Sequence, residues 1–194
     1  LILGANGKLG SIFYKHLSKN NKNKIITTST GTINYSSKLH KKIDLKKNLN
    51  KVLKIISEEK PNLIINCLFI RNNNNEYDID IPKQIIIYIN RKKYKNILWL
   101  EIGSYSIFLK HKTNYVRNKI IFENFLKKKY TNNLSDLKII RIGNFLNNQM
   151  ANKLNFLNTK KYQFVLSNKK NIFFLSDYQM IKQFFDKLPK NKKI

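Results

Sequence analysis

The sequence contains a single cysteine, Cys67, so no disulfide can form within the chain. Structural disulfides belong to oxidising compartments, and their absence favours a reducing, cytoplasmic setting. Hydrophobic runs are short, because none approaches the roughly 18 apolar residues of a transmembrane helix, and no signal-peptide pattern precedes the first strand. An initiator methionine is also lacking, so we expect a few residues to be missing before Leu1.

Histidine is scarce and scattered. His16, His40 and His111 lie far apart, and none has cysteine or histidine neighbours at the spacing of metal ligands. The sequence therefore predicts no metal site.

Acidic residues are few, with 11 Asp and Glu against 38 Lys and Arg, which gives a net charge of +27. Such a basic chain could bind nucleic acid. Only four of the 38 basic residues are arginine, however, and arginine is best suited to bidentate phosphate and base contacts. The lysines are spread along the whole chain, and lysine, asparagine and isoleucine are enriched together, as in an AT-rich genome. A nucleic-acid-binding module therefore ranks behind the hypotheses developed below.

What the chain has is an alternation of apolar strand-like and helix-like segments over a length of 194 residues, enough for one domain with a buried core. The predicted strands are 1–3, 24–30, 63–68, 96–102 and 137–142, and the predicted helices include 9–17, 49–56, 82–89 and 115–126. This order predicts an α/β fold of the Rossmann type, a doubly wound parallel sheet. Residues 71–80 are predicted to be an exposed loop. Residues 144–194 would form a small C-terminal extension on the substrate side of the same domain, 1–194, ending in a helix capped by Ser176 or Asp177.

The first strand runs into three glycines, Gly4, Gly7 and Gly10, spaced as G-x-x-G-x-x-G. In a dinucleotide site the first glycine allows a tight turn, the second lets the backbone approach a pyrophosphate, and the third lets helix and strand pack closely. About twenty residues later, an NAD-preferring fold places a carboxylate on the ribose. Here Ser29 and Thr30 occupy that place, with Lys38 a little beyond, which favours NADP.

A second group of candidate residues follows the predicted strand 96–102, after which come Gly103 and Ser104. Tyr115 and Lys119 are four residues apart on a predicted helix, so both side chains leave the same face. An ammonium beside a tyrosine stabilises the phenolate, and the spacing therefore predicts a lowered tyrosine pKa and acid–base chemistry on a carbonyl or carbinol oxygen. Glu101 is unusual, because a carboxylate on a buried strand needs a partner or a raised pKa.

Together these segments resemble the short-chain dehydrogenase/reductase family, nearest to its extended or atypical branch of NAD-dependent epimerases and dehydratases. The opening and the Pro61 stretch are similar in particular to the dTDP-4-dehydrorhamnose reductase group. The resemblance covers almost the whole chain and rests on the segments 4–10, 43–45, 61–67, 140–144 and 174–177, and on Tyr115 with Lys119 and Glu123.

The resemblance implies roles for individual residues. Gly4, Gly7 and Gly10 would hold the pyrophosphate with Asn6, Lys8 and Leu9 along it; Asp44 and Leu45 would flank the adenine; Asn66, Cys67 and Leu68 would line the nicotinamide side. Tyr115 would be the acid–base residue, and Lys119 would hold the nicotinamide ribose. The catalytic hydroxyl stays open between Ser104, the first choice, and Ser106, because Ile102 stands where simple spacing from the tyrosine would put it.

The sequence therefore predicts an NAD(P)-dependent oxidoreductase or epimerase acting on a small carbonyl or nucleotide-linked sugar. The alternative is a non-catalytic NAD(P)-binding sensor or scaffold of the same fold. The tail after Gly143 is short for a full sugar-nucleotide lobe, which puts that substrate class in question. The resemblance also implies a homodimer, formed through the helices around Ile85 and Ile120.

Overall fold

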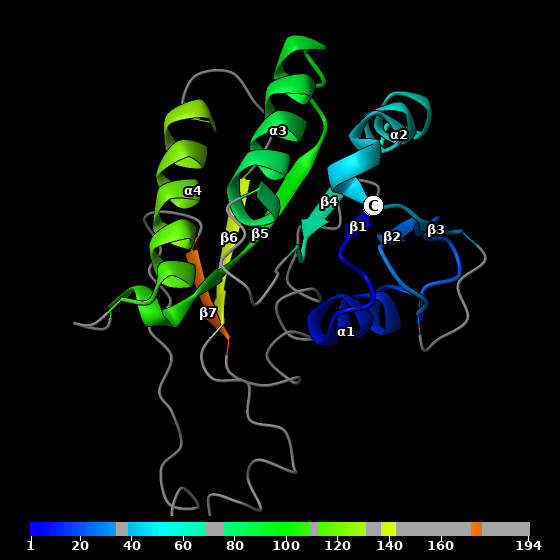
Figure 1. Cartoon of the computed structure of the whole chain (residues 1–194). Helices are drawn as coiled ribbons and strands as arrows, with labels where there is room; N and C mark the ends of the chain where they lie inside the picture. Colours follow the sequence, from blue (N-terminus) through cyan, green and yellow to red (C-terminus); the bar gives the residue numbers. More distant parts are fainter. Residues whose placement is uncertain (34–38, 69–75, 109–111, 131–136, 143–171, 176–194) are drawn as a thin grey trace, which may run out of the picture.

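The computed structural model describes residues 1–33, 39–68, 76–108, 112–130, 137–142 and 172–175. Within these ranges seven parallel strands form one sheet in the order β3-β2-β1-β4-β5-β6-β7 (Figure 1). The strands are β1 (Ile2–Leu3), β2 (Thr27–Ser29), β3 (His40–Lys42), β4 (Leu63–Asn66), β5 (Leu98–Ser104), β6 (Leu137–Ile142) and β7 (Ile172–Leu175). The helices are α1 (Lys8–Leu17), α2 (Leu45–Glu59), α3 (Ile81–Arg91) and α4 (Asn114–Tyr130), with short helical turns η1 (Glu76–Asp80) and η2 (Tyr105–Phe108).

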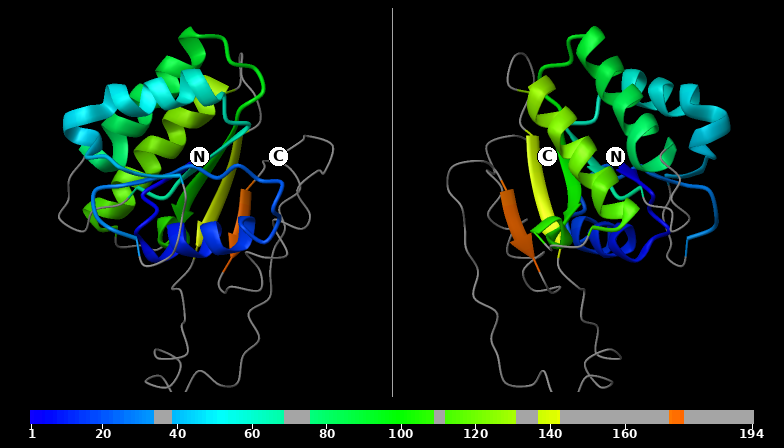
Figure 2. Two further views of the ribbon diagram at one scale, coloured as in Figure 1. Left: turned by 90° about the vertical axis from the view of Figure 1, so that its right-hand side faces the viewer. Right: turned by 60° about the vertical axis from the view of Figure 1, so that its left-hand side comes forward.

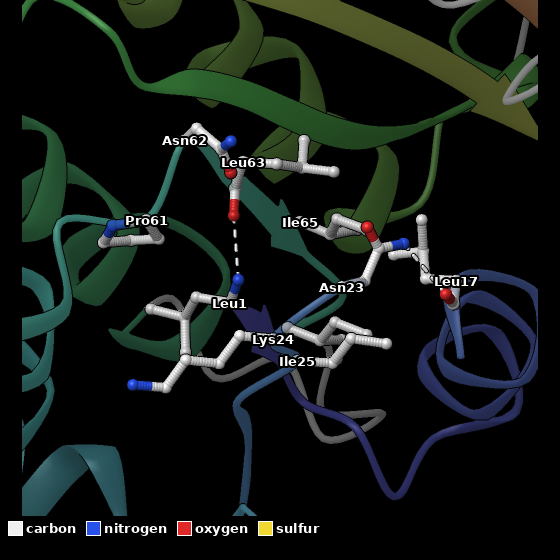
Figure 3. Close-up of a pocket in the computed structure, with 10 residues that line it drawn as sticks. Leu1, Leu17, Asn23, Lys24, Ile25, Pro61, Asn62, Leu63 and Ile65 are labelled. Atoms are coloured by element: carbon white, nitrogen blue, oxygen red, sulfur yellow. Dashed lines mark hydrogen bonds between the residues drawn. The ribbon is translucent and has the colours of Figure 1, made fainter. Parts of the chain in front are cut away.

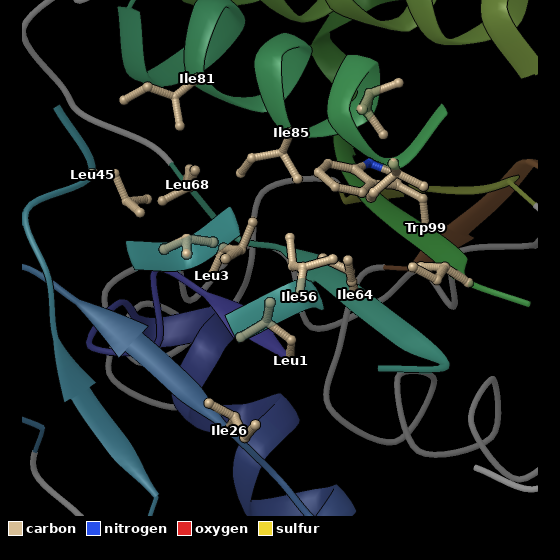
Figure 4. Close-up of a cluster of buried hydrophobic side chains, with 14 of the residues drawn as sticks. Leu1, Leu3, Ile26, Leu45, Ile56, Ile64, Leu68, Ile81, Ile85 and Trp99 are labelled. Atoms are coloured by element: carbon tan, nitrogen blue, oxygen red, sulfur yellow. The ribbon is translucent and has the colours of Figure 1, made fainter. Parts of the chain in front are cut away.

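Helices cover both faces of the sheet because successive strand residues point to opposite sides. Leu3 and Trp99 pack with α2, α3 and α4 (Figure 4), whereas their neighbours Ile2 and Leu100 pack on the other face, with Phe13 of α1. Figure 2 shows α1 apart from the other three helices. The central strands β1 and β4, which are buried on both faces, therefore read as nearly continuous apolar runs in the sequence. The predicted doubly wound parallel sheet of the Rossmann type is confirmed.

The chain changes direction between β1 and β4. It first builds the sheet outward from β1 through β2 to β3, and then returns to place β4 on the other side of β1. In such sheets ligands bind in the crevice beyond the carboxyl ends of the strands at this switch point. The glycine turn after β1 lies there, beside the exit of β4.

Three local predictions were wrong. The strand predicted over 24–30 is only Thr27–Ser29, and β3 was missed because its His-Lys-Lys sequence is that of a solvent-facing edge strand with no apolar alternation. Residues 76–80 do not form an exposed loop, since they are the helical turn η1, in which Asp78 and Ile79 are buried. A run of asparagines on the N-terminal side hid that turn in the sequence.

The predicted C-terminal extension, 144–194, lies outside the described residues apart from the backbone of β7. The predicted capping residues Ser176 and Asp177, and Lys38, lie outside them too. No helix in the described ranges has both the length and the apolar character of a membrane crossing.

Candidate active site

The glycine turn after β1 is closed by contacts that admit no side chain at two of its three glycines. Gly4 adopts a φ of +75°, and a Cβ there would lie 2.7 Å from the carbonyl oxygen of Cys67. A Cβ on Gly10 would lie 2.6 Å from the carbonyl oxygen of Gly4. Gly4 therefore permits the turn against β4, and Gly10 permits the close packing of α1 on β1.

Gly7 differs from both, because a Cβ there would meet only the Gly4 carbonyl oxygen, at 3.4 Å. It is the exposed N-cap of α1, without a side-chain cap, and α1 carries no acidic residue in its first turn. Asn6 and Lys8 beside it are exposed, and Leu9 is half-buried. The amino end of a helix with this surface suits an anionic group such as a pyrophosphate.

The end of β2 carries hydroxyls where NAD-preferring folds carry a carboxylate. Ser29 Oγ donates to the carbonyl oxygen of Gly31 at 2.6 Å and lies 3.3 Å from His40 Nε2, while Thr30 is exposed. Asn6 of the glycine turn reaches this strand end, since its Nδ2 would be 3.4 Å from a Cβ on Gly31.

The residues expected to flank the adenine have structural contacts of their own. Asp44 caps α2, with its side chain accepting the backbone N–H of Lys46 at 3.0 Å. Leu45 is buried in the same cluster as Leu68 (Figure 4).

Tyr115, Lys119 and Ser104 come together at the carboxyl end of β5. A hydrogen bond joins the side chains of Tyr115 and Ser104, and Lys119 acts on Tyr115 electrostatically from the next turn of α4. Ser104 Oγ also accepts the backbone N–H of Ser106, at 3.2 Å. Of the two candidate serines, Ser104 is the one whose side chain meets the tyrosine.

The expected lowering of the Tyr115 pKa is wrong in its net direction. Burial raises this pKa, and the carboxylates of Asp78 and Glu101 add to the rise, while Lys119 and the Ser104 hydrogen bond oppose it. Lys119 thus acts as the spacing predicts, but desolvation outweighs it. At neutral pH Tyr115 is a phenol, the form that donates a proton.

Glu101 lies beneath this group, fully buried in the middle of the sheet. Its Oε1 accepts from Lys119 Nζ at 3.1 Å, and its Oε2 accepts from Asn66 Nδ2 at 2.7 Å and from Trp99 Nε1 at 3.1 Å. Burial raises the pKa of Glu101, and Lys119, Asn66 and Trp99 oppose that rise. Burial by itself would lower the pKa of Lys119, but the Glu101 carboxylate, followed by Tyr115, outweighs it and raises that pKa.

The sheet register ties the glycine turn to this ion pair. Leu3 pairs with Asn66, and Asn66 pairs with Glu101, so the three residues form one row across β1, β4 and β5. Two strand spacings amount to about 10 Å. One extended molecule can therefore touch both the glycine turn and Lys119.

Sequence reasoning missed two buried polar residues of the site, Asp78 and Asn118. Asp78 of η1 is buried, and its Oδ2 accepts from Asn118 Nδ2 of α4 at 3.4 Å. Its carboxylate raises the pKa of Tyr115 and Lys119. Pro82 marks the start of α3 and gives the one sequence signal nearby, but it does not show that the chain before it folds against α4.

A second buried ion pair lies one turn further along α4. Glu123 and Arg141 of β6 meet through two contacts, Nη2 to Oε2 at 2.5 Å and Nε to Oε1 at 3.4 Å. The Arg141 guanidinium carbon lies 5.3 Å from the centre of the Phe108 ring, which is 57% exposed. We refer to Lys119–Glu101 as the β5 pair and to Glu123–Arg141 as the β6 pair.

A pocket in the structure lies at the opposite ends of the strands (Figure 3). Residues at the amino ends of β1 and β4 and before β2 line it, and the backbone nitrogen of Leu1 donates to the carbonyl oxygen of Leu63 at 2.8 Å. None of the residues to which the family resemblance assigns a cofactor-binding or catalytic role borders this pocket. The candidate cofactor-binding and catalytic residues lie instead at the carboxyl ends of the strands.

No family model matches the sequence, and no curated protein is similar to it. Solved structures share its fold. A 4-hydroxyisoleucine dehydrogenase complexed with NADH aligns with a TM-score of 0.65 and 16% identity over 100% of this chain and 92% of its own. For a short chain dehydrogenase from Burkholderia cenocepacia in complex with NADP the values are 0.65, 11%, 98% and 93%.

A UDP-glucuronic acid 4-epimerase from Bacillus cereus in complex with NAD aligns with a TM-score of 0.58 and 15% identity over 74% of this chain and 55% of its own. The chain spans about half the length of the epimerases it matches. At these identities the likeness shows the Rossmann-type fold alone.

Proposed function

We propose that the protein is an NAD(P)-dependent oxidoreductase of the short-chain dehydrogenase/reductase type, acting on a small carbonyl compound or a nucleotide-linked sugar. One observation carries the proposal: Tyr115, Ser104 and Lys119 meet at the carboxyl end of β5, two strands from a turn whose glycines Gly4 and Gly10 leave no room for a side chain. The dehydrogenases and epimerases that share the fold include structures with bound NADH, NADP and NAD.

The residues present fit a dinucleotide. The exposed Gly7 leaves room for a close approach of the backbone, and the uncapped amino end of α1 would face the pyrophosphate. Asn66, Cys67 and Leu68 would lie along the nicotinamide side. Thr30 and Ser29 bring no carboxylate to the ribose, which supports NADP over NAD.

Each catalytic side chain has a distinct task. A bound nicotinamide would supply or accept the hydride. Tyr115 Oη would pass a proton to the substrate oxygen, Ser104 Oγ would donate a hydrogen bond to the same oxygen, and the Lys119 ammonium would stabilise the phenolate left behind. As a phenol, Tyr115 would donate the proton that reduction of a carbonyl oxygen requires.

Cofactor binding is tested first, by fluorescence titration with NADPH and NADH. We expect saturable binding, tighter for NADPH. Gly7→Ala should weaken it about tenfold, equivalent to about 1.4 kcal/mol, with only a small loss of melting temperature, because a Cβ at Gly7 makes an ordinary contact and the loss reflects the poorer capping by alanine. If neither cofactor binds, the proposal is wrong.

Turnover is tested with a panel of small ketones and nucleotide-linked 4-keto sugars, by loss of NADPH absorbance. Tyr115→Phe should lower kcat about 10²- to 10⁴-fold, the usual contribution of an acid–base residue. Tyr88→Phe, which removes a hydroxyl from α3, is the control and should leave kcat unchanged. Undiminished turnover in Tyr115→Phe would contradict this mechanism. Binding of a cofactor with no Tyr115-dependent turnover would favour the sensor or scaffold instead.

A further inference from the structure

Among the described residues, the hydrogen-bond partners of the buried acid Glu101 are all donors. Each of its hydrogen-bond partners, Lys119 Nζ, Asn66 Nδ2 and Trp99 Nε1, can donate but cannot accept. The two carboxylate oxygens therefore serve three donors, and the ionised form satisfies all of them. A protonated Glu101 would turn a hydroxyl toward at least one N–H group.

The carboxylate links two parts of the candidate site that come from different elements. On one side it holds Lys119, which α4 places one turn after Tyr115. On the other side it holds Asn66, whose Oδ1 accepts the backbone N–H of Leu68 at 3.2 Å. The chain between Asn66 and Leu68 carries the Cys67 carbonyl against which Gly4 closes. A single carboxylate thus connects the ammonium beside the tyrosine to the turn out of β4.

We propose that Glu101 is a positioning residue, whose ionised carboxylate fixes Lys119 beside Tyr115 and, through Asn66, fixes the turn on the nicotinamide side. This inference rests on the function proposed above. It assigns to the unusual buried acid a task that glutamine could perform only in part, because an amide has one acceptor oxygen for the three donors and no charge to pair with the Lys119 ammonium.

The groups around Glu101 determine which residues respond when its carboxylate is protonated. The groups that act on it or on its partners are Lys119 and Tyr115 from α4, Asp78 from η1, and Cys67 after β4. Burial is the largest influence and raises the pKa of Glu101 above its ordinary value of 4.5. Mild acid should therefore protonate Glu101 before it protonates exposed carboxylates, and should release Lys119 and Asn66 together.

The single tryptophan of the chain offers a direct measurement, because Trp99 Nε1 donates to the same carboxylate. Trp99 fluorescence of the wild-type protein should change with pH with a midpoint above 4.5, while far-ultraviolet circular dichroism stays constant. This titration needs neither substrate nor cofactor, and no variant. A flat fluorescence signal down to the pH of unfolding would overturn the proposal.

The kinetic test compares two matched substitutions, Glu101→Gln and Glu123→Gln. Each removes the charge of a buried glutamate paired with a cation, and α4 contributes one partner to each pair. Glu101→Gln should lower kcat/KM about 100-fold, the cost of a small misplacement of a reacting group. The wild-type kcat/KM should fall in mild acid as Glu101 becomes protonated, and Glu101→Gln should abolish both this acid limb of the pH profile and the Trp99 transition. Glu123→Gln should retain both, and Glu101→Asp should recover part of the rate.

The results separate this proposal from the proposed function. If Tyr115→Phe is inactive while Glu101→Gln keeps the wild-type rate or its acid limb, the positioning role is wrong and the proposed function stands. If no cofactor binds but Trp99 titrates with Glu101, the proposed function is wrong and only the ionised network is supported. Equal effects of both glutamine variants on the pH profile would reduce Glu101 to a structural role and overturn the proposal.

Discussion

The β5 pair and the β6 pair have the same construction and different surroundings. In each, a side chain of α4 reaches a neighbouring strand and is buried there with its partner, 18 residues away in sequence. Lys119 and Glu123 are four residues apart, so the two pairs lie one helical turn apart on the same face. The β5 pair is surrounded by further donors and by Tyr115. The β6 pair is stacked against an exposed phenylalanine ring.

The difference shows that a buried ion pair does not by itself mark a functional site. In the β6 pair, both hydrogen bonds that the Glu123 carboxylate accepts from the described residues come from Arg141. In the β5 pair one glutamate also serves Asn66 and Trp99, and the lysine has a single hydrogen bond among the described residues. An ammonium with three N–H groups and one partner can take further acceptors, such as ribose hydroxyls.

The largest expected effect comes from removing one partner of either pair. Arg141→Met would leave the Glu123 carboxylate buried without its cation, and Glu101→Leu would leave Lys119 in the same state. Each should lower the free energy of unfolding by about 3–5 kcal/mol, measured by urea denaturation. If Arg141→Met and Glu101→Leu lose similar stability but different amounts of cofactor affinity, the two pairs differ in function rather than in their contribution to stability. A loss below 1 kcal/mol at Arg141 would contradict the buried geometry.

Gly103→Ala should produce a smaller loss that falls on the β6 pair alone. A Cβ on Gly103 would lie 2.6 Å from Glu123 Oε1 and 3.3 Å from Arg141 Cγ, so the pair must move to accommodate it. Overpacking of this kind costs about 1–3 kcal/mol. Thermal unfolding measures the loss, and the Trp99 pH titration, which reports on the β5 pair, should not change. A shifted Trp99 midpoint would show that the two pairs are coupled.

The sequence predicted the sheet and part of the site because both depend on local patterns. The apolar strands, the three glycines and the Tyr115–Lys119 spacing are each read within a few residues. The need of Glu101 for a partner was also evident from its place on a buried strand. Two of its partners could not be predicted, because Asn66 of β4 and Lys119 of α4 meet it only after the three elements pack, whereas Trp99 lies two residues away in the same strand. Asp78 was missed for the same reason, since its burial depends on α4.

The double substitution Glu123→Gln with Arg141→Met should cost less than Arg141→Met alone. The single change leaves a charge in a buried site, whereas the double change leaves a polar amide, whose desolvation is far less costly. The difference between the two free energies of unfolding isolates the cost of the stranded carboxylate. If the double variant were no more stable than the single one, the loss at Arg141 would reflect packing against Phe108 rather than charge.

The smallest expected effect is a change of stability with alkaline pH that belongs to the β5 pair. The pKa of Lys119 is raised above 10.5 in the folded chain, chiefly because Glu101 outweighs burial, so the native state holds this proton more tightly than the unfolded state. The resulting stability is complete below pH 10.5 and is lost as the pH rises through the higher native value. Tyr115, whose pKa burial raises above 10.0, acts in the same direction.

Arginine keeps its proton at any pH at which a protein stays folded, so the β6 pair should not contribute. Urea denaturation across this range should therefore show a steeper alkaline loss for the wild-type protein than for Lys119→Met, and an equally steep one for Arg141→Met. Parallel curves for wild type and Lys119→Met would mean that Glu101 does not stabilise the charged lysine.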